Sequence, residues 1–210
     1  PPLSVQGVPD STRPMAVINL THLGNTTRVY FCHWTARLDS DSDVIRSRIA
    51  VELSNDVFDF IGSDETRHVV IVGDLNEEPF DENMRQMYAH RHRARATAGR
   101  HYTDAASRRI NVYNASWRLL GERHPHSPKS GQIDVAGTYF WAKKRTWHTL
   151  DQVLVSGGLL GASRPFLDES SVSIIVNQKL VNGNVPEQFE FGSGKAGVSD
   201  HLPIQLTIGI

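Results

Sequence analysis

The run from His68 to Val72, which reads His-Val-Val-Ile-Val, places the strongest limit on how this chain can fold. It is short, continuous and apolar, and this pattern fits a strand buried on both faces. A sheet that contains such a strand must be covered by further layers on both sides. Strand-like runs elsewhere are separated by only a few helical patterns, so we expect a layered α+β or α/β sandwich.

Periodicity predicts the other elements. Strands are expected where apolar residues alternate or β-branched residues gather, over 3–8, 15–20, 28–34, 137–141, 150–155, 172–176 and 203–208. A helix is expected over 43–61, because apolar residues recur there at helical spacing, and a second helix over 81–92. No internal repeat or low-complexity linker divides the chain, so we expect one domain over 1–210.

Composition excludes several classes of protein. Hydrophobic residues make up 39% and charged residues 21% of the chain, which excludes a disordered protein. The net charge of −1 excludes binding of nucleic acid by bulk positive charge, but not by a local basic patch. Cys32 is the one cysteine, so intramolecular disulfides and cysteine zinc clusters are excluded. No apolar run approaches the ~20 residues of a membrane span.

The sequence Gly73-Asp74-Leu75-Asn76 follows the buried run directly. Side chains two residues apart point the same way from an extended chain, so Asp74 and Asn76 are expected on one side. Such a pair suits a hard cation or an activated water on Asp74, with Asn76 donating to a phosphate oxygen. A polar turn that ends the strand explains the same residues about as well.

Three further positions could carry chemistry. Asp200 and His201 stand just before the last predicted strand, and they could supply a carboxylate and a general acid or base. Asp151 opens an apolar strand and could orient a histidine, and His33 ends another strand. Taken singly, each is better explained as an ordinary loop or strand-end residue.

In combination, the order and spacing of these elements resemble the endonuclease/exonuclease/phosphatase superfamily. The matching residues are His33-Trp34-Thr35-Ala36, Gly73-Asp74-Leu75-Asn76, Leu150-Asp151-Gln152-Val153-Leu154 and Ser199-Asp200-His201. The resemblance implies a four-layer α/β/β/α sandwich of the DNase I-like type. It also implies hydrolysis of a phosphate ester with Mg²⁺ or Mn²⁺.

The resemblance also implies roles for the matching residues. Asp74 and Asp200 correspond to metal-side carboxylates, and Asp74 could instead activate water. Asn76 corresponds to a phosphate-orienting amide. His201 corresponds to a general base or transition-state stabiliser oriented by Asp151, and His33 to a phosphate contact or proton donor.

The N-terminal part of the superfamily pattern has no counterpart here. Members usually carry an Asn in their first strand and a metal-binding Glu further on, whereas Asp10 is the one acid between Pro1 and Arg28. We expect a domain incomplete at its N-terminus, in agreement with a chain that starts at Pro1 without methionine. A second chain could supply the missing segment. Loss of the metal in a degenerate member, or replacement by another carboxylate, would also explain the pattern.

The substrate is indicated only by a basic segment over 90–109, which includes Arg91, Arg93 and Arg95. These side chains could contact backbone phosphates, which favours a nuclease, although a solvated basic surface explains them about equally well. A phosphatase or phospholipase-type enzyme of the same superfamily is the alternative, and a non-catalytic partner-binding domain is the third. Tyr139, Trp141 and Trp147 could stack on bases, but we expect them to serve strand packing.

Overall fold

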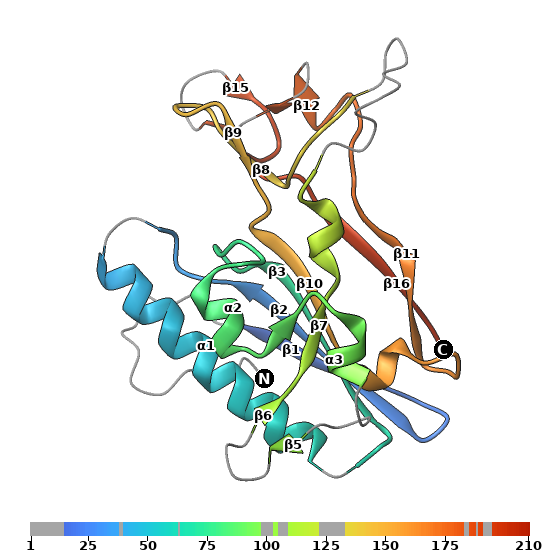
Figure 1. The fold of residues 1–210 in the computed structure, drawn as a ribbon. Coiled ribbons are helices and arrows are strands. Elements are labelled where there is room, and N and C mark those ends of the chain that lie inside the picture. Colours follow the sequence, from blue (N-terminus) through green and yellow to red (C-terminus); the bar gives the residue numbers. More distant parts are fainter. Residues whose placement is uncertain are drawn as a thin grey trace.

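A computed structural model describes residues 15–37, 40–62, 64–97, 103–104, 109–121, 133–182, 185–187, 189–190 and 195–210 (Figure 1). Its main sheet has six strands in the order β1-β2-β3-β10-β7-β4. These are β1 (Ala16–His22), β2 (Asn25–His33), β3 (Arg67–Asp74), β10 (Asp151–Ser156), β7 (Val112–Asn114) and β4 (Ala89–His90). The buried run of the sequence analysis is the third strand of this order, β3, which pairs with β2 on one side and β10 on the other.

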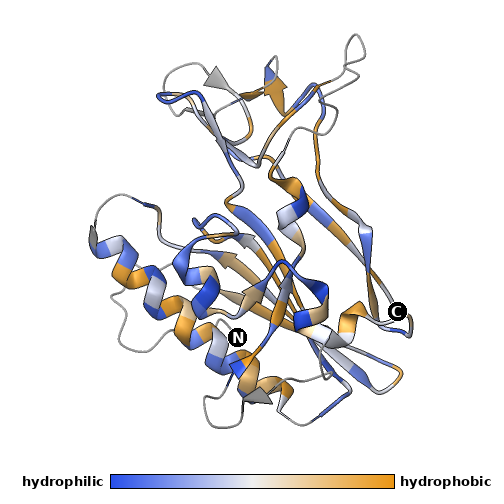
Figure 2. Cartoon of the chain, viewed as in Figure 1, coloured by the Kyte–Doolittle hydropathy of each residue, from blue (hydrophilic) through white to orange (hydrophobic). Residues whose placement is uncertain are grey.

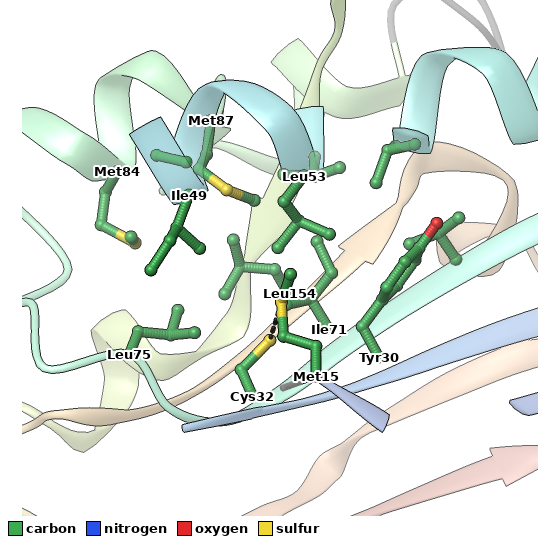
Figure 3. Close-up of a cluster of buried hydrophobic side chains, with 14 of the residues drawn as sticks. Met15, Tyr30, Cys32, Ile49, Leu53, Ile71, Leu75, Met84, Met87 and Leu154 are labelled. Carbon is green, nitrogen blue, oxygen red and sulfur yellow. Dashed lines mark hydrogen bonds between the residues drawn. The ribbon is translucent and has the colours of Figure 1, made fainter. Parts of the chain in front are cut away.

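A helical layer covers one face of the main sheet. Helix α1 (Ser40–Ile61) turns an apolar stripe toward the strands, and its hydrophobic and hydrophilic residues alternate along the ribbon in Figure 2. Ile49, Leu53 and Val57 from this stripe are buried. Figure 3 shows Ile49 and Leu53 meeting side chains of the sheet, with Met84 of the short helix α2 (Glu82–Gln86) beside them.

Cys32 lies inside this core as a small apolar side chain. Its Sγ contacts Met15 Sδ at 3.6 Å (Figure 3). Burial raises the pKa of the Cys32 thiol to about 12, so the thiolate that would react or bind metal is not formed at neutral pH.

A second sheet packs against part of the other face of the main sheet. It pairs β11 (Phe166–Ile174) with β16 (Ile204–Gly209) in antiparallel register. Leu167, Val172 and Ile174 of β11 pack with Val153 and Val155 of the main sheet in a second apolar core. The expected α+β fold is therefore confirmed, with β3 buried between a layer of helices and a layer of strands.

Short elements complete the described chain. They are α3 (Arg93–Thr97), the 3₁₀ helices η1 (Ala115–Leu119) and η2 (Gly157–Leu160), and the two-stranded pairs β5 (Thr103–Asp104)–β6 (Arg109–Ile110), β8 (Tyr139–Trp141)–β9 (Thr146–His148), β12 (Val181–Asn182)–β13 (Val185–Pro186) and β14 (Phe189–Glu190)–β15 (Lys195–Ala196). In Figure 1 the β8–β9 hairpin stands above one end of the main sheet.

The helix expected over 81–92 is wrong in its second half. Helix α2 ends at Gln86, and Tyr88 takes a positive φ of 54° that a continuing helix does not allow. The chain then enters β4 and the separate helix α3. The strand expected over 3–8 lies outside the described residues. No helix in the described ranges is long and apolar enough to cross a membrane.

The second sheet leaves uncovered a part of the main-sheet face against which it packs. Val29 packs into the second core, but its neighbours on the same face, Ile18 and Phe31, are 43% and 47% exposed. A pocket of about 390 Å³, lined in part by Leu20 and Val29, opens between the β1–β2 turn and the end of β16. Within the described ranges β16 pairs only with β11, so its other edge has no strand partner among these residues.

Candidate active site

Three neighbouring strands bring the predicted side chains together at one end of the main sheet. In the parallel pair β2–β3, His33 stands beside Asp74, and in the antiparallel pair β3–β10, Asp151 stands beside Asp74. His33, Asp74 and Asp151 therefore form a row across three strand ends. His33 Nε2 lies 3.6 Å from Asp74 Oδ2, and the Asp74 side chain is only 13% exposed.

Gly73 lets these strands approach each other closely. Its φ is +128°, and a Cβ at this position would lie 2.2 Å from the carbonyl oxygen of Cys32. Any other residue would push β2 away from β3 and separate His33 from Asp74. The glycine that precedes Asp74 is thus required by the backbone itself.

The loop after Asp74 holds that carboxylate on several sides. The backbone N–H of Asn76 donates to Asp74 Oδ1 at 2.8 Å, and Asn76 Nδ2 donates to Asp74 Oδ2 at 2.9 Å and to the Trp34 carbonyl at 3.0 Å. Asn76 has a positive φ of 49°, and asparagine tolerates this region better than most residues. Asn76 thus orients Asp74 in this structure, and its contact with a phosphate stays a prediction.

His201 completes the group from a segment far along the chain. Its Nδ1 lies 2.7 Å from Asp151 Oδ2, and its backbone N–H donates to Ser199 Oγ at 3.0 Å. An antiparallel bridge to Tyr139 fixes the same segment against the hairpin. The pairing of His201 with Asp151 that the resemblance implied is thus the one the structure contains.

The surroundings of His201 raise its pKa above the ordinary value. Burial of the imidazole acts in the opposite direction, but the hydrogen bond to Asp151 and the negative charges of Asp151, Asp74 and Asp200 outweigh it. The fold therefore stabilises the imidazolium form relative to that of a free histidine, and the carboxylates of Asp74 and Asp200 act on the same ring.

Replacing Asp151 with Asn is expected to lower the pKa of His201, which NMR titration of the metal-free protein would measure. Because the pKa of His201 is higher in the folded than in the unfolded protein, protonation of His201 stabilises the fold. This stabilisation is fully present at a pH below the pKa of the unfolded state, and it is lost as the pH rises through the pKa of the folded state. Asp151→Asn should therefore destabilise the protein more at mildly acidic pH than at alkaline pH. An unchanged His201 titration would contradict the electrostatic role assigned to Asp151.

A metal site is only partly built by the described residues. Asp74 offers carboxylate oxygens, which are the ligands that Mg²⁺ and Mn²⁺ prefer, and Asp200 is exposed on the segment that carries His201. Among the residues that the structure describes, however, no group of three or more His, Cys, Asp or Glu side chains is arranged to hold an ion. The described donors alone do not fit a complete metal centre.

A buried ion-pair cluster beneath the loop was not expected from the sequence. The Glu77 carboxylate, which is next in the chain to Asn76, accepts from Arg46 Nε at 2.6 Å, Asn83 Nδ2 at 2.6 Å and Arg37 Nη2 at 3.2 Å. Arg37 Nε also donates to the carbonyl of Asn76 at 2.7 Å. The pKa of Glu77 is raised overall, because the effect of burial exceeds the opposite effect of the hydrogen bonds from Asn83 and Arg46. The cluster ties α1 and α2 to the loop of Asp74.

A second histidine–carboxylate pair was also missed. His148 Nδ1 lies 2.8 Å from Glu78 Oε1, and the backbone N–H of Thr149 donates to Glu78 Oε2 at 3.1 Å. Two adjacent glutamates after Gly-Asp-x-Asn could have signalled both contacts, because acidic side chains that are buried require partners.

The three arginines predicted to bind nucleic acid have different surroundings. Arg93 forms an ion pair with Glu169 at 2.7 Å and donates to the carbonyl of Leu160. Arg91 lies over the ring of Trp117 at 5.5 Å, and Arg95 is exposed on α3. Arg93 therefore has a structural partner that its two neighbours do not share.

An α+β sandwich whose central strands end in these His, Asp and Asn side chains is the architecture expected of a phosphoesterase. The chain matches the family described as the Endonuclease/Exonuclease/phosphatase family over residues 8–209, and it belongs to that family. The family consists of hydrolytic phosphoesterases, whose members generally use divalent metals. No curated protein sequence matches the chain significantly.

Solved structures show the same fold. Truncated TDP2 from Caenorhabditis elegans is 14% identical, with a TM-score of 0.53 over 99% of this chain and 64% of its own. A humanized TDP2 from D. rerio with 14 mutations is 13% identical, with a TM-score of 0.54 over 100% of this chain and 65% of its own. The chain thus spans slightly less than two thirds of the length of these two proteins.

Proposed function

We propose that this chain hydrolyses phosphodiester bonds and that its substrate is a nucleic acid. The observation that carries the proposal is the hydrogen-bonded Asp151–His201 pair beside Asp74 and His33, at the ends of three adjacent strands. Displacement at phosphorus depends mainly on positioning and on neutralising charge, and this row of side chains is held from several sides.

The chain's own residues supply proton transfer and orientation. Because Asp151 engages Nδ1, Nε2 is the His201 nitrogen left to exchange a proton with water or with the leaving oxygen. His33 is 53% exposed and can reach a phosphate oxygen from the other side of Asp74. When bound, Mg²⁺ or Mn²⁺ would offset the negative charges of Asp74, of Asp200 and of the substrate phosphate.

The isolated chain is expected to bind Mg²⁺ weakly and to cleave phosphodiesters poorly, because the described donors do not complete a metal centre. Titration with Mn²⁺ during a plasmid-nicking assay would measure both properties, with a heat-treated sample as the blank. Robust nicking at low Mn²⁺ would mean that the chain's own residues suffice as ligands.

We also propose that a second polypeptide segment completes the domain by adding strands beside β16. Three observations support this: the unpaired edge of β16 among the described strands, the exposed apolar side chains of Ile18, Leu20 and Phe31, and the shorter span of this chain relative to TDP2. Native mass spectrometry of the protein from its own host should find such a segment associated with this chain. A protein that is monomeric there and fully active would contradict the proposal.

The basic segment is expected to contact nucleic-acid phosphates through Arg91 and Arg95. Replacing both with Gln should reduce the slope of log K against log salt by roughly 0.7 to 0.9 for each phosphate that is no longer neutralised. Replacing all three arginines, with Arg93 included, should also lower stability, because Arg93 holds Glu169. Arg93→Gln alone is the matched control and should leave the slope nearly unchanged. A double variant with the wild-type slope would remove this segment from the binding surface.

Substrate screening separates this proposal from its alternative within the family. DNA, RNA and phosphoinositides would be compared at equal phosphate concentration. Preference for the phosphoinositide would favour a phosphatase or phospholipase-type activity instead.

A further inference from the structure

The β8–β9 hairpin presents two aromatic faces with different surroundings. Phe140 and Trp147 lie on one face with their ring centroids 5.2 Å apart, and Trp147 packs against the second apolar core. Tyr139 and Trp141 point the other way, because strand side chains alternate, and Tyr139 is paired across the hairpin with His148. Packing therefore explains the first face and leaves the second face unexplained.

The rings of this second face form a strip that starts at the catalytic pair. Ring centroids lie 4.9 Å apart from His201 to Tyr139, 6.2 Å from Tyr139 to His148, and 6.1 Å from His148 to Trp141. Trp141 is 36% exposed, and the Nζ of Lys144 lies 4.5 Å from the centroid of its ring. The strip thus leads from the half-buried His201 to solvent and ends beside a positive charge.

Glu78 fixes the middle of this strip to the loop of Asp74. It binds His148 Nδ1 and also accepts from the backbone N–H of Thr149, so His148 has a carboxylate partner in the way that His201 has Asp151. Glu78 itself is buried, at 8% exposure. A ring that a buried carboxylate already holds in place is suited to binding, because little conformational freedom is lost when a ligand binds.

We propose that Tyr139, His148 and Trp141 form a stacking surface for a nucleobase attached through its sugar to the scissile phosphate. This inference rests on the proposed function and adds that the substrate is single-stranded beside the cut, because only an unpaired base exposes its face. Aromatic faces stack on any base, so the surface selects strandedness more than sequence. The ammonium of Lys144, which lies over one face of the Trp141 ring, adds a positive charge that attracts the nucleic-acid backbone.

Binding measured without hydrolysis tests this surface. The probes are fluorescein-labelled hexathymidylate and a hexamer of abasic tetrahydrofuran nucleotides with the same charge, and the readout is fluorescence anisotropy without divalent metal. One stacked base contributes about 1 to 3 kcal/mol, so the wild type should bind hexathymidylate roughly tenfold more tightly than the abasic chain. Trp141→Leu and Tyr139→Leu should each remove most of that difference and leave abasic binding unchanged.

Matched variants separate stacking from folding. Phe140→Leu, on the opposite face of the same strand, should keep the preference for bases, and Trp141→Phe should restore much of it. Equal binding of the two probes by the wild type, or a full preference in Trp141→Leu, would overturn the stacking surface even if nuclease activity is found. A base preference in protein from its own host that cleaves no phosphodiester in saturating Mn²⁺ would support the surface and reject the proposed function.

Discussion

In the protein from its own host, phosphodiester cleavage in saturating Mn²⁺ is expected to fall by about 10²- to 10⁴-fold when Asp151 is replaced with Asn. The amide would keep the size of the side chain but lose the charge that orients His201 Nδ1 across 2.7 Å. The amide NH₂ of asparagine would also donate a hydrogen bond to His201 Nδ1, whereas Nδ1–H in the wild type donates to the carboxylate. The imidazole would then be held in the tautomer that carries its proton on Nε2. Single-turnover cleavage of a labelled oligonucleotide would measure the loss.

Asp64→Asn is the matched control for that experiment. Asp64 precedes β3 at the end of the strand opposite Asp74, and it is an acid within hydrogen-bond distance of Thr66. Its replacement should leave cleavage within about twofold, because the partners of Asp64 lie at the far end of the strand from the site. If Asp151→Asn and His201→Ala both retain every activity of the wild type, the fold serves a binding role and the hydrolytic proposal fails.

The candidate site could be predicted from the sequence because its parts end strands. Asp74 follows a continuous apolar run, and Asp151 begins another, so both had to lie at strand ends. The register that sets His33 and Asp151 on either side of Asp74 was not readable, since pairing depends on contacts between distant segments. From the sequence, only the family resemblance predicted that these residues lie together in one site.

The supporting residues could not be predicted for a related reason. Arg46 sits in the helical pattern of α1 among surface-like arginines, yet it is 1% exposed. Its burial follows from a partner, Glu77, that is 31 residues away in a loop. Local periodicity assigns a charged residue to the solvent, and only tertiary packing can reverse that assignment. The end of the expected second helix could not be predicted either, because helical spacing does not encode the positive φ of Tyr88.

Replacing Arg46 with Met is expected to lower the free energy of unfolding by about 3 kcal/mol, at the low end for breaking a buried ion pair. Glu77 would remain buried at 4% exposure with Asn83 and Arg37 as its partners, so its charge would be only partly compensated. The Ser42 hydroxyl and the carbonyl of Thr35 would also lose their donor. Urea unfolding followed by circular dichroism would measure the change.

The double variant Arg46→Met with Glu77→Gln distinguishes a buried charge from lost packing. If the unpaired carboxylate causes the loss, removing it should recover part of the stability, so the double variant should be more stable than the sum of the two single changes predicts. Exposed Arg85→Met, from the surface pair with Glu82, is the control and should change stability by less than about 1 kcal/mol. Strict additivity would mean that Arg46 acts by filling space alone.

Because Glu77 adjoins Asn76, Arg46→Met should also loosen the hold on Asp74 and reduce cleavage more than its loss of stability accounts for.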